Sequence, residues 1–228
     1  MSPRNQKLSA CVDGRLAAYA TLAGVVLAAP AMAPSADASI VYSGVVNINI
    51  PSTTSGIYLN VVTGVFGGST TPGWDVNPWA STSLEIWGNN TASPNDGVLD
   101  NFTGGSAASV DNLPVGTLID GTWNYGRTDG TVESTGPTAF VLNSSNNIFG
   151  FRFLNESTSQ IDFGWARISL TATQSSQPRM IVEYAYDNTG AGINAGNTGV
   201  PEPTTMALLG VMAAGALGVR AWRKRKAA

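Results

Sequence analysis

Hydrophobic and polar residues alternate through most of the chain between residues 39 and 199, which is the spacing of half-buried β-strands. The apolar runs are rich in Val, Ile, Thr and aromatic residues, and Pro-Gly, Asn-Asp-Gly and Asp-Gly steps mark turns between them. No stretch of this body shows a convincing helical period. The pattern predicts eight strands, at 40–50, 56–66, 82–88, 117–125, 138–143, 147–154, 161–171 and 179–187.

The clearest local pattern lies at 147–171, where two alternating runs flank a polar turn at 155–160. This pattern predicts a β-hairpin whose aromatic side chains belong to the core. Gly150 and Gly164 leave room for close packing beneath the rings. The expected core residues are Phe149, Phe151 and Phe153 in the first strand and Ile161, Phe163 and Trp165 in the second.

Residues 1–38 have the layout of a secretory signal peptide. Basic residues precede an apolar run at 16–29, and an Ala-x-Ala sequence ends at Ala38. We expect a signal peptidase to cleave after Ala38, because an earlier Ala-x-Ala site is followed by Pro34, which disfavours cleavage. The alternative is a retained membrane anchor, although the apolar run is short for a membrane span.

Residues 200–228 combine three features in a fixed order. A proline-rich segment begins the tail and can neither pair in a sheet nor continue a helix. The apolar run at 206–219 would form a helix of about 21 Å, which spans a membrane when its flanking residues extend it. We therefore expect a C-terminal transmembrane helix, with the body on the far side of the membrane. Its cytoplasmic end would be held by Arg223, Lys224, Arg225 and Lys226.

The sequence Pro201-Glu202-Pro203, followed by an apolar helix and a basic cluster, resembles the sorting signal of PEP-CTERM proteins. The hairpin at 147–171 and the sequence VEYAYDNTGAGINAG after it are also similar to a body that recurs among those proteins. The resemblance implies that an exosortase, an integral membrane protease, recognises the tail and cleaves near Pro201–Pro203. It also implies the surface of a Gram-negative bacterium that makes exopolysaccharide. The alternative for this tail is a plain membrane anchor.

Together these features predict a signal peptide at 1–38, an all-β body at 39–199 and a sorting signal at 200–228. Eight strands in a body of about 160 residues favour a single jelly-roll-like β-sandwich. This sandwich would lie between the N-terminal signal helix and the C-terminal transmembrane helix.

Charge and composition exclude several functions. The body at 39–199 carries four arginines and no lysine against twelve carboxylates, a net charge of −8, which argues against nucleic-acid binding. The chain has no histidine, and its one cysteine, Cys11, lies in the leader before the apolar run, so we expect no lipid attachment there. Catalysis by Ser-His-Asp or Cys-His groups is therefore excluded, as are His-ligated metals, and we expect no cofactor.

One turn-rich segment carries candidate binding residues. Trp74 and Trp79 lie in the sequence GWDVNPW, which we expect to be a loop. Exposed tryptophan rings stack on sugar faces, and Asp75 and Asn77 would bond sugar hydroxyls. The segment therefore predicts a glycan-binding loop, with burial of both rings at the sandwich edge as the alternative.

Oxygen-rich side chains between residues 89 and 101 provide weak calcium ligands, chiefly Asp96 and Asp100. The spacing of an EF-hand is absent, so we assign no metal site. A glycosidase needs two carboxylates, and nothing in the spacing of the available glutamates singles out a pair. We therefore predict no enzyme activity and no catalytic residue. The glutamates considered are Glu85, Glu133, Glu156 and Glu183.

The sequence thus favours an exported protein with a non-catalytic structural or adhesive role in the exopolysaccharide matrix or biofilm. A carbohydrate-binding, lectin-like module is the first alternative and a glycan hydrolase the second. The expected partners are a signal peptidase, an exosortase and the exopolysaccharide itself. The chain would pass through an inner-membrane intermediate, held by its C-terminal helix, before it reaches the cell surface or the matrix.

Overall fold

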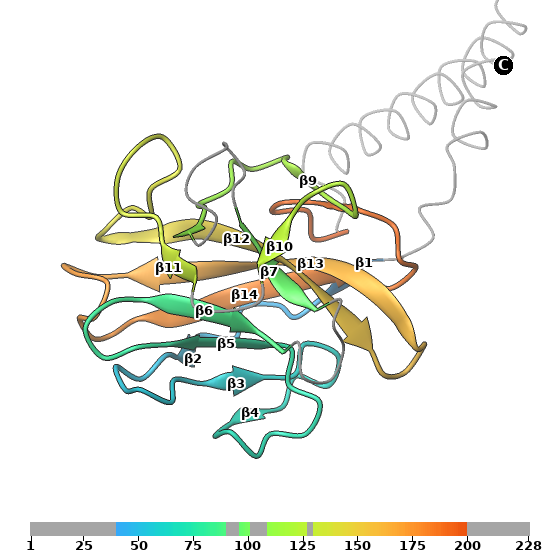
Figure 1. Ribbon diagram of the computed structural model, residues 1–228, viewed down its shortest axis with the longest axis horizontal. Helices are drawn as coiled ribbons and strands as arrows, with labels where there is room; N and C mark the ends of the chain where they lie inside the picture. The colour runs from blue at the N-terminus through green and yellow to red at the C-terminus, as the bar shows by residue number, and fades with distance from the viewer. Residues whose placement is uncertain (1–39, 90–95, 101–108, 127–129, 200–228) are drawn as a thin grey trace, which may run out of the picture. The chain divides into compact units, whose positions relative to one another are not determined.

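The computed structural model describes residues 40–89, 96–100, 109–126 and 130–199. All regular elements in these ranges are strands, which confirms the predicted all-β class (Figure 1). The predicted signal and transmembrane helices lie outside the described residues. Within those ranges, there is no helix with the length and apolar character that a membrane span requires.

The larger sheet has seven strands in the order β1-β14-β13-β12-β7-β10, with β2 also paired to β14. The pairings among these strands are antiparallel. We call this sheet A. Its strands are β1 (Ile40–Tyr42), β2 (Ile48–Asn49), β7 (Gly97–Leu99), β10 (Tyr125–Gly126), β12 (Ser144–Asn155), β13 (Gln160–Leu170) and β14 (Met180–Asp187).

The second sheet, sheet B, has six strands in the order β4-β3-β5-β6-β11-β8, and its β11–β8 pair is parallel. A third sheet consists of two strands, β15 and β9. The strands of sheet B are β3 (Tyr58–Leu59), β4 (Phe66–Gly67), β5 (Val76–Trp79), β6 (Glu85–Gly88), β8 (Ser109–Val110) and β11 (Gly130–Val132). Those of the third sheet are β9 (Leu118–Ile119) and β15 (Ile193–Asn194).

The hairpin β12–β13 is the longest paired unit, and it confirms the hairpin predicted at 147–171. Phe151 pairs with Gly164 in the neighbouring strand, and its ring lies over β13 at this glycine, which has no side chain. A Cβ atom on Gly164 would lie 2.6 Å from that ring, which explains why glycine occupies this position. The expected aromatic core residues are buried, because Phe149, Phe151, Phe153 and Trp165 are all 0 % exposed.

The core is divided between the two faces of sheet A. Phe149, Phe151 and Phe153 pack with residues of sheet B, such as Leu59 and Ile86, so the two sheets bury their facing surfaces against each other. The opposite face of sheet A carries Phe163 and Trp165. It is covered by residues of β9 and β15, chiefly Ile119 and Ile193, and Tyr125 of the edge strand β10 packs against the same cluster. Sheet A is therefore buried on both faces.

A buried arginine joins three loops at the edge of these sheets. Arg179 is 0 % exposed, and its guanidinium has five N–H groups, each of which donates to a backbone carbonyl. No carboxylate pairs with it among these contacts, and burial lowers its pKa. The acceptors are the carbonyls of Ile50 at 3.1 Å, Pro51 at 2.8 Å, Ala80 at 2.6 Å, Ser83 at 2.7 Å and Gln174 at 2.8 Å.

Several predicted elements differ from the structure. The strand predicted at 138–143 is wrong: this segment is irregular, and Phe140 is buried there through a turn rather than through strand pairing. The loop predicted at 73–79 is also wrong in part, because β5 occupies the centre of sheet B. The long runs at 40–50, 56–66 and 117–125 each contain two short strands instead of one.

Candidate functional site

Four aromatic side chains lie on the outer face of sheet B, the face turned away from sheet A. In β3, β5 and β6, the core-facing residues Leu59, Val76 and Ile86 alternate with outward-facing ones. Because β5 pairs with both β3 and β6, the outward-facing side chains of these three strands lie side by side on the outer face. We call the resulting surface the aromatic face, and it consists of Tyr58, Trp74, Trp79 and Trp87.

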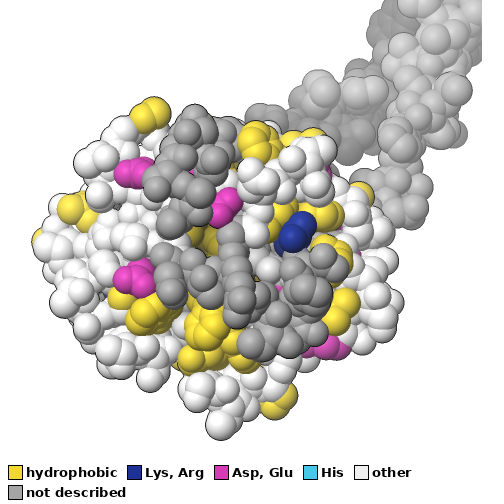
Figure 2. Space-filling model, viewed as in Figure 1, with side chains coloured by type: hydrophobic (Ala, Val, Ile, Leu, Met, Phe, Trp, Pro, Cys, Tyr) yellow, Lys and Arg dark blue, Asp and Glu magenta, His cyan; other side chains and the backbone are white. Residues whose placement is uncertain are grey.

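Three rings of the aromatic face, those of Tyr58, Trp74 and Trp87, contact one another, and all four rings are partly buried. Trp74 packs edge to face between Tyr58, at 4.9 Å between ring centroids, and Trp87, at 5.4 Å. Such pairs stabilise a fixed arrangement of the rings. Figure 2 shows hydrophobic surface gathered where Figure 1 places β3, β5 and β6. The aromatic face is thus an ordered, partly accessible apolar surface.

Two of these tryptophans carry an unusual energetic cost. The indole nitrogens of Trp79 and Trp87 are buried and have no hydrogen-bond partner. A buried donor without a partner costs about 1–3 kcal/mol, and buried tryptophan N–H groups usually find an acceptor. Departures of this kind from ordinary packing occur mostly at functional sites. The positions of both rings therefore favour a role for the ring faces over one for the N–H groups.

The polar residues expected to bond sugars are occupied within the fold. Asp75 is 3 % exposed and accepts a hydrogen bond from the Val61 backbone N–H at 2.7 Å. Asn77 is 1 % exposed and donates to the Ser55 carbonyl at 3.0 Å. Both side chains are therefore inaccessible to a ligand, although the pairing of Asn77 with Trp87 places Asn77 on the outer face of sheet B.

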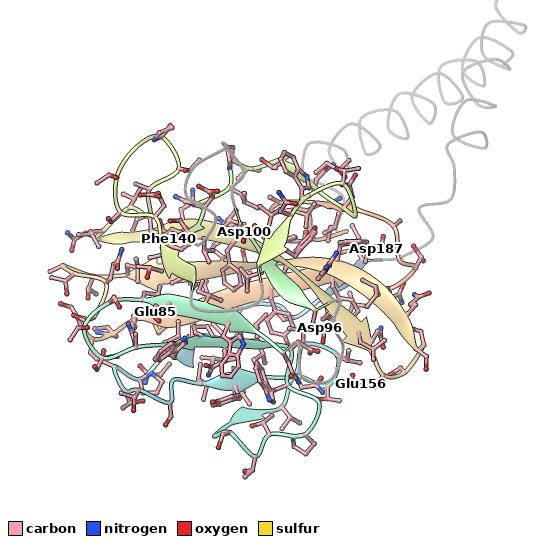
Figure 3. The ribbon with its side chains drawn as sticks, in the orientation of Figure 1. Glu85, Asp96, Asp100, Phe140, Glu156 and Asp187 are labelled. Carbon is pink, nitrogen blue, oxygen red and sulfur yellow. The ribbon has the colours of Figure 1, made fainter. Side chains whose placement is uncertain are left out.

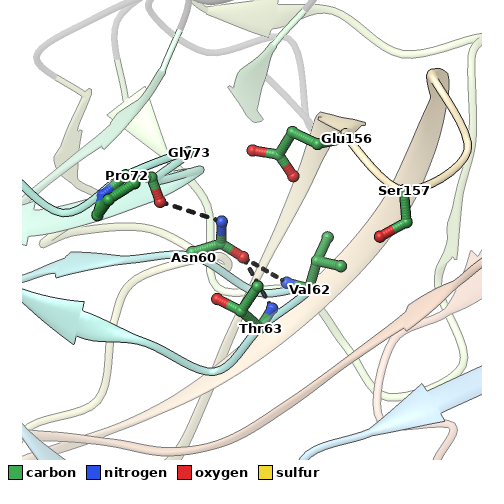
Figure 4. A pocket seen from close by; sticks show the side chains of 7 residues that line it. All are labelled: Asn60, Val62, Thr63, Pro72, Gly73, Glu156 and Ser157. Atoms are coloured by element: carbon green, nitrogen blue, oxygen red, sulfur yellow. Dashed lines mark hydrogen bonds between the residues drawn. The ribbon is translucent and has the colours of Figure 1, made fainter.

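A hollow of about 410 Å³ lies beside this region, between turns of sheet B and the tip of the β12–β13 hairpin (Figure 4). Asn60 organises its floor by donating to the Pro72 carbonyl at 3.2 Å and accepting from the backbone N–H groups of Val62 and Thr63. The rim carries the exposed side chains of Glu156 and Ser157. The hollow is therefore shallow and lined by both polar and apolar groups, with one carboxylate at its edge.

Asp75 lies close to other carboxylates. Burial, together with smaller effects of the charges of Glu156 and Asp96, raises the pKa of Asp75 to about 8 against the lowering effect of the Val61 hydrogen bond. Figure 3 shows Asp96 and Glu156 toward the same end of the strands. This environment favours the neutral form of the Asp75 carboxyl group.

Asp96 and Asp100, the weak calcium candidates, are both buried. Asp96 is 4 % exposed, and Asp100 is 8 % exposed and forms an isolated bridge with Val110. Residues 90–95 and 101–108, which complete the oxygen-rich segment, lie outside the described residues. Among the residues that are described, no group of three or more acidic, His or Cys side chains is arranged to hold a metal ion.

The four glutamates considered for glycan hydrolysis occupy separate places. Glu85 is on β6 in sheet B, while Glu183 is on β14 in sheet A and accepts a hydrogen bond from Arg167 Nε at 2.7 Å. Glu133 caps a turn by accepting from the backbone N–H groups of Ser134 and Thr135. The Glu156 side chain lies at the hairpin tip. No two of these glutamates share a hydrogen-bond partner among the described contacts.

The segment Pro201–Pro203, which was predicted to be a sorting motif, and the basic cluster at 223–226 lie outside the described residues. Comparison with family models, curated proteins and solved structures finds no match to this chain.

The sequence indicated Trp74 and Trp79 as binding residues but did not predict that they share one surface with Tyr58 and Trp87. The alternation of apolar and polar residues in 56–66 and 82–88 could have indicated this, because it places Tyr58 and Trp87 on the side of their strands that faces away from the core.

Proposed function

We propose that this chain is an exported surface protein with a non-catalytic, structural or adhesive role in the exopolysaccharide matrix of a Gram-negative bacterium. A signal peptidase removes residues 1–38, and an exosortase processes the tail at 200–228. As part of this proposal, the facing sheets A and B belong to a jelly-roll-like β-sandwich. This body would be displayed outside the cell, and the membrane would hold it only before processing.

The observation that carries this proposal is the order of the three parts of the tail: Pro201-Glu202-Pro203, the apolar run and the basic cluster. The signal peptide at 1–38 supports the same direction of export. The acidic, lysine-free body is also suited to remaining soluble among extracellular polymers.

Replacing Pro201, Glu202 and Pro203 together with alanine should block tail processing in a host that encodes an exosortase. The protein would then stay in the membrane fraction with its basic end attached, because the apolar helix remains. Fractionation and immunoblotting with an antibody to residues 223–228 measures this retention. A matched control replaces Thr204 and Thr205 with alanine, and it should be processed like the wild type. Release of the triple variant at the wild-type rate would refute the sorting role of the motif.

A second candidate function is carbohydrate binding, and the aromatic face favours it. Half-buried tryptophan and tyrosine rings, held in fixed orientations on an open sheet face, offer flat apolar area to the C–H faces of sugar rings. This role is compatible with the first, since an adhesive matrix protein needs a surface that holds the polymer.

A further inference from the structure

We propose that the aromatic face binds the side of an uncharged polysaccharide chain. This inference rests on the second candidate function above and specifies its ligand. It commits to neutral polymers and excludes the acidic ones that many matrices contain.

The shape of the surface favours a polymer over a single sugar. Tyr58, Trp79 and Trp87 come from three adjacent strands of sheet B, whose neighbours lie about 4.8 Å apart. The partly exposed rings therefore extend across three strands, and the hollow described above is lined by other residues. Rings spread across a sheet in this way suit contact with the side of a chain, whereas a concave pocket encloses its ligand.

The residue types favour sugar over an apolar protein surface. The large exposed aliphatic side chains of the described residues lie elsewhere, for example Val45 before β2, Val65 beside β4 and Val115 before β9. The aromatic face instead presents only rings, with the half-buried carboxylate of Glu85 opposite Trp79 in the strand pairing. Tryptophan and tyrosine offer a rigid apolar face whose rim stays compatible with water and hydroxyl groups.

Charge decides between neutral and acidic polymers. The body has a net charge of −8, and an acidic chain would be repelled by this field. The described arginines offer no counter-charge on the aromatic face. Arg167 pairs with Glu183 on sheet A, Arg179 is buried against carbonyls, and Arg152 lies over the Tyr125 ring at 4.6 Å. Arg127 is outside the described residues.

Affinity electrophoresis of the mature exported protein tests the inference. Native gels would contain hydroxyethylcellulose, galactomannan or glycogen as neutral probes, or alginate as the acidic probe. At least one neutral polymer should retard the protein, and alginate should not. Added salt should leave the neutral retardation unchanged, because the contact is not ionic. Retardation by alginate alone, or by none of the four polymers, would overturn the inference.

Variants locate the surface. Trp74→Ala and Trp87→Ala should each weaken retardation at least about tenfold, as expected for loss of a central aromatic contact. Phe66→Ala is the matched control, because Phe66 is an aromatic residue of sheet B that is 52 % exposed on edge strand β4. An equal loss in Phe66→Ala would contradict the assignment.

A second readout avoids dependence on variant folding. Saturating neutral polymer should shift the tryptophan emission of the wild-type protein to shorter wavelength, since the rings lose water contact. Retardation without any change in emission would place the binding elsewhere. A protein that is exported and loses its tail, yet binds no polymer, would overturn this inference alone. A polymer-binding protein that keeps its tail would overturn only the sorting proposal.

Discussion

Replacing Arg179 with methionine should lower the free energy of unfolding by about 3–5 kcal/mol. Methionine removes the cost of burying a charge, but it also removes a donor from five backbone carbonyls. The carbonyls of Ile50 and Pro51 keep a second donor, whereas those of Ala80, Ser83 and Gln174 lose the one described for them. Each buried carbonyl without a partner costs about 1–3 kcal/mol, so their sum outweighs the relief. The midpoint of urea unfolding should fall, with an unchanged dependence on denaturant concentration.

Two further variants give this result its controls. Arg179→Lys should also destabilise strongly, because an ammonium group has three donors and cannot reach five carbonyls in the planar arrangement of a guanidinium. Arg167→Met removes a partly exposed ion pair with Glu183 and should cost less than about 1 kcal/mol. If Arg179→Met lowers the free energy of unfolding no more than Arg167→Met does, the hydrogen bonds from Arg179 to the backbone carbonyls contribute nothing to stability.

Asp75→Asn should change how stability depends on pH. The pKa of Asp75 is raised from 3.8 to about 8 by burial. A carboxyl with a raised folded-state pKa stabilises the fold fully below its unfolded pKa, and this contribution is lost as pH rises toward the folded pKa. Between about pH 5 and pH 7, the wild type should therefore lose about 1.4 kcal/mol per pH unit relative to Asp75→Asn. Urea melts of both proteins across this range measure the difference.

Asn77→Ala provides a control in the same strand. It exchanges one uncharged buried side chain for another, so its stability should follow the wild-type pH curve at a constant offset. Asparagine at position 75 keeps an acceptor for the Val61 N–H and cannot ionise. Parallel curves for Asp75→Asn and the wild type would show that Asp75 has no raised pKa.

The sequence predicted best where the elements are long. The strands β12 and β13 have 12 and 11 residues, aromatic residues alternate within each, and their pairing needs only a local turn. The β14 strand was predicted within one residue of its start for the same reason. Long strands carry several repeats of the period, so an irregular position does not hide the pattern.

The missed elements are short or contain residues that usually mark loops. Pro78 indicated a loop, yet it lies in the central strand β5, where its carbonyl accepts from the Ile57 N–H at 3.0 Å. Strands of two or three residues, such as β8 and β11, have no measurable period. The opposite error at 138–143 arose because Phe140 enters the core from an irregular segment.

The candidate site was predictable only in part, because it depends on neighbours far apart in sequence. The tryptophans at 74 and 79 were visible as unusual residues in a turn-rich segment. The contact of Trp74 with Tyr58 and Trp87 requires the adjacency of β3, β5 and β6, which alternation alone does not determine. The buried state of Arg179 had no local signal at all, since an arginine before a strand is ordinarily exposed.

The intact mass of the mature surface protein, purified from its native host and from the same host without its exosortase, tests the central claim most directly. We expect the native protein to begin at Ser39 and to end near Pro201–Pro203, because both terminal signals would have been removed. The protein from the exosortase-deficient host should begin at the same residue and retain the complete tail to Ala228. A mature native protein that still carries the basic cluster at 223–226 would contradict the account.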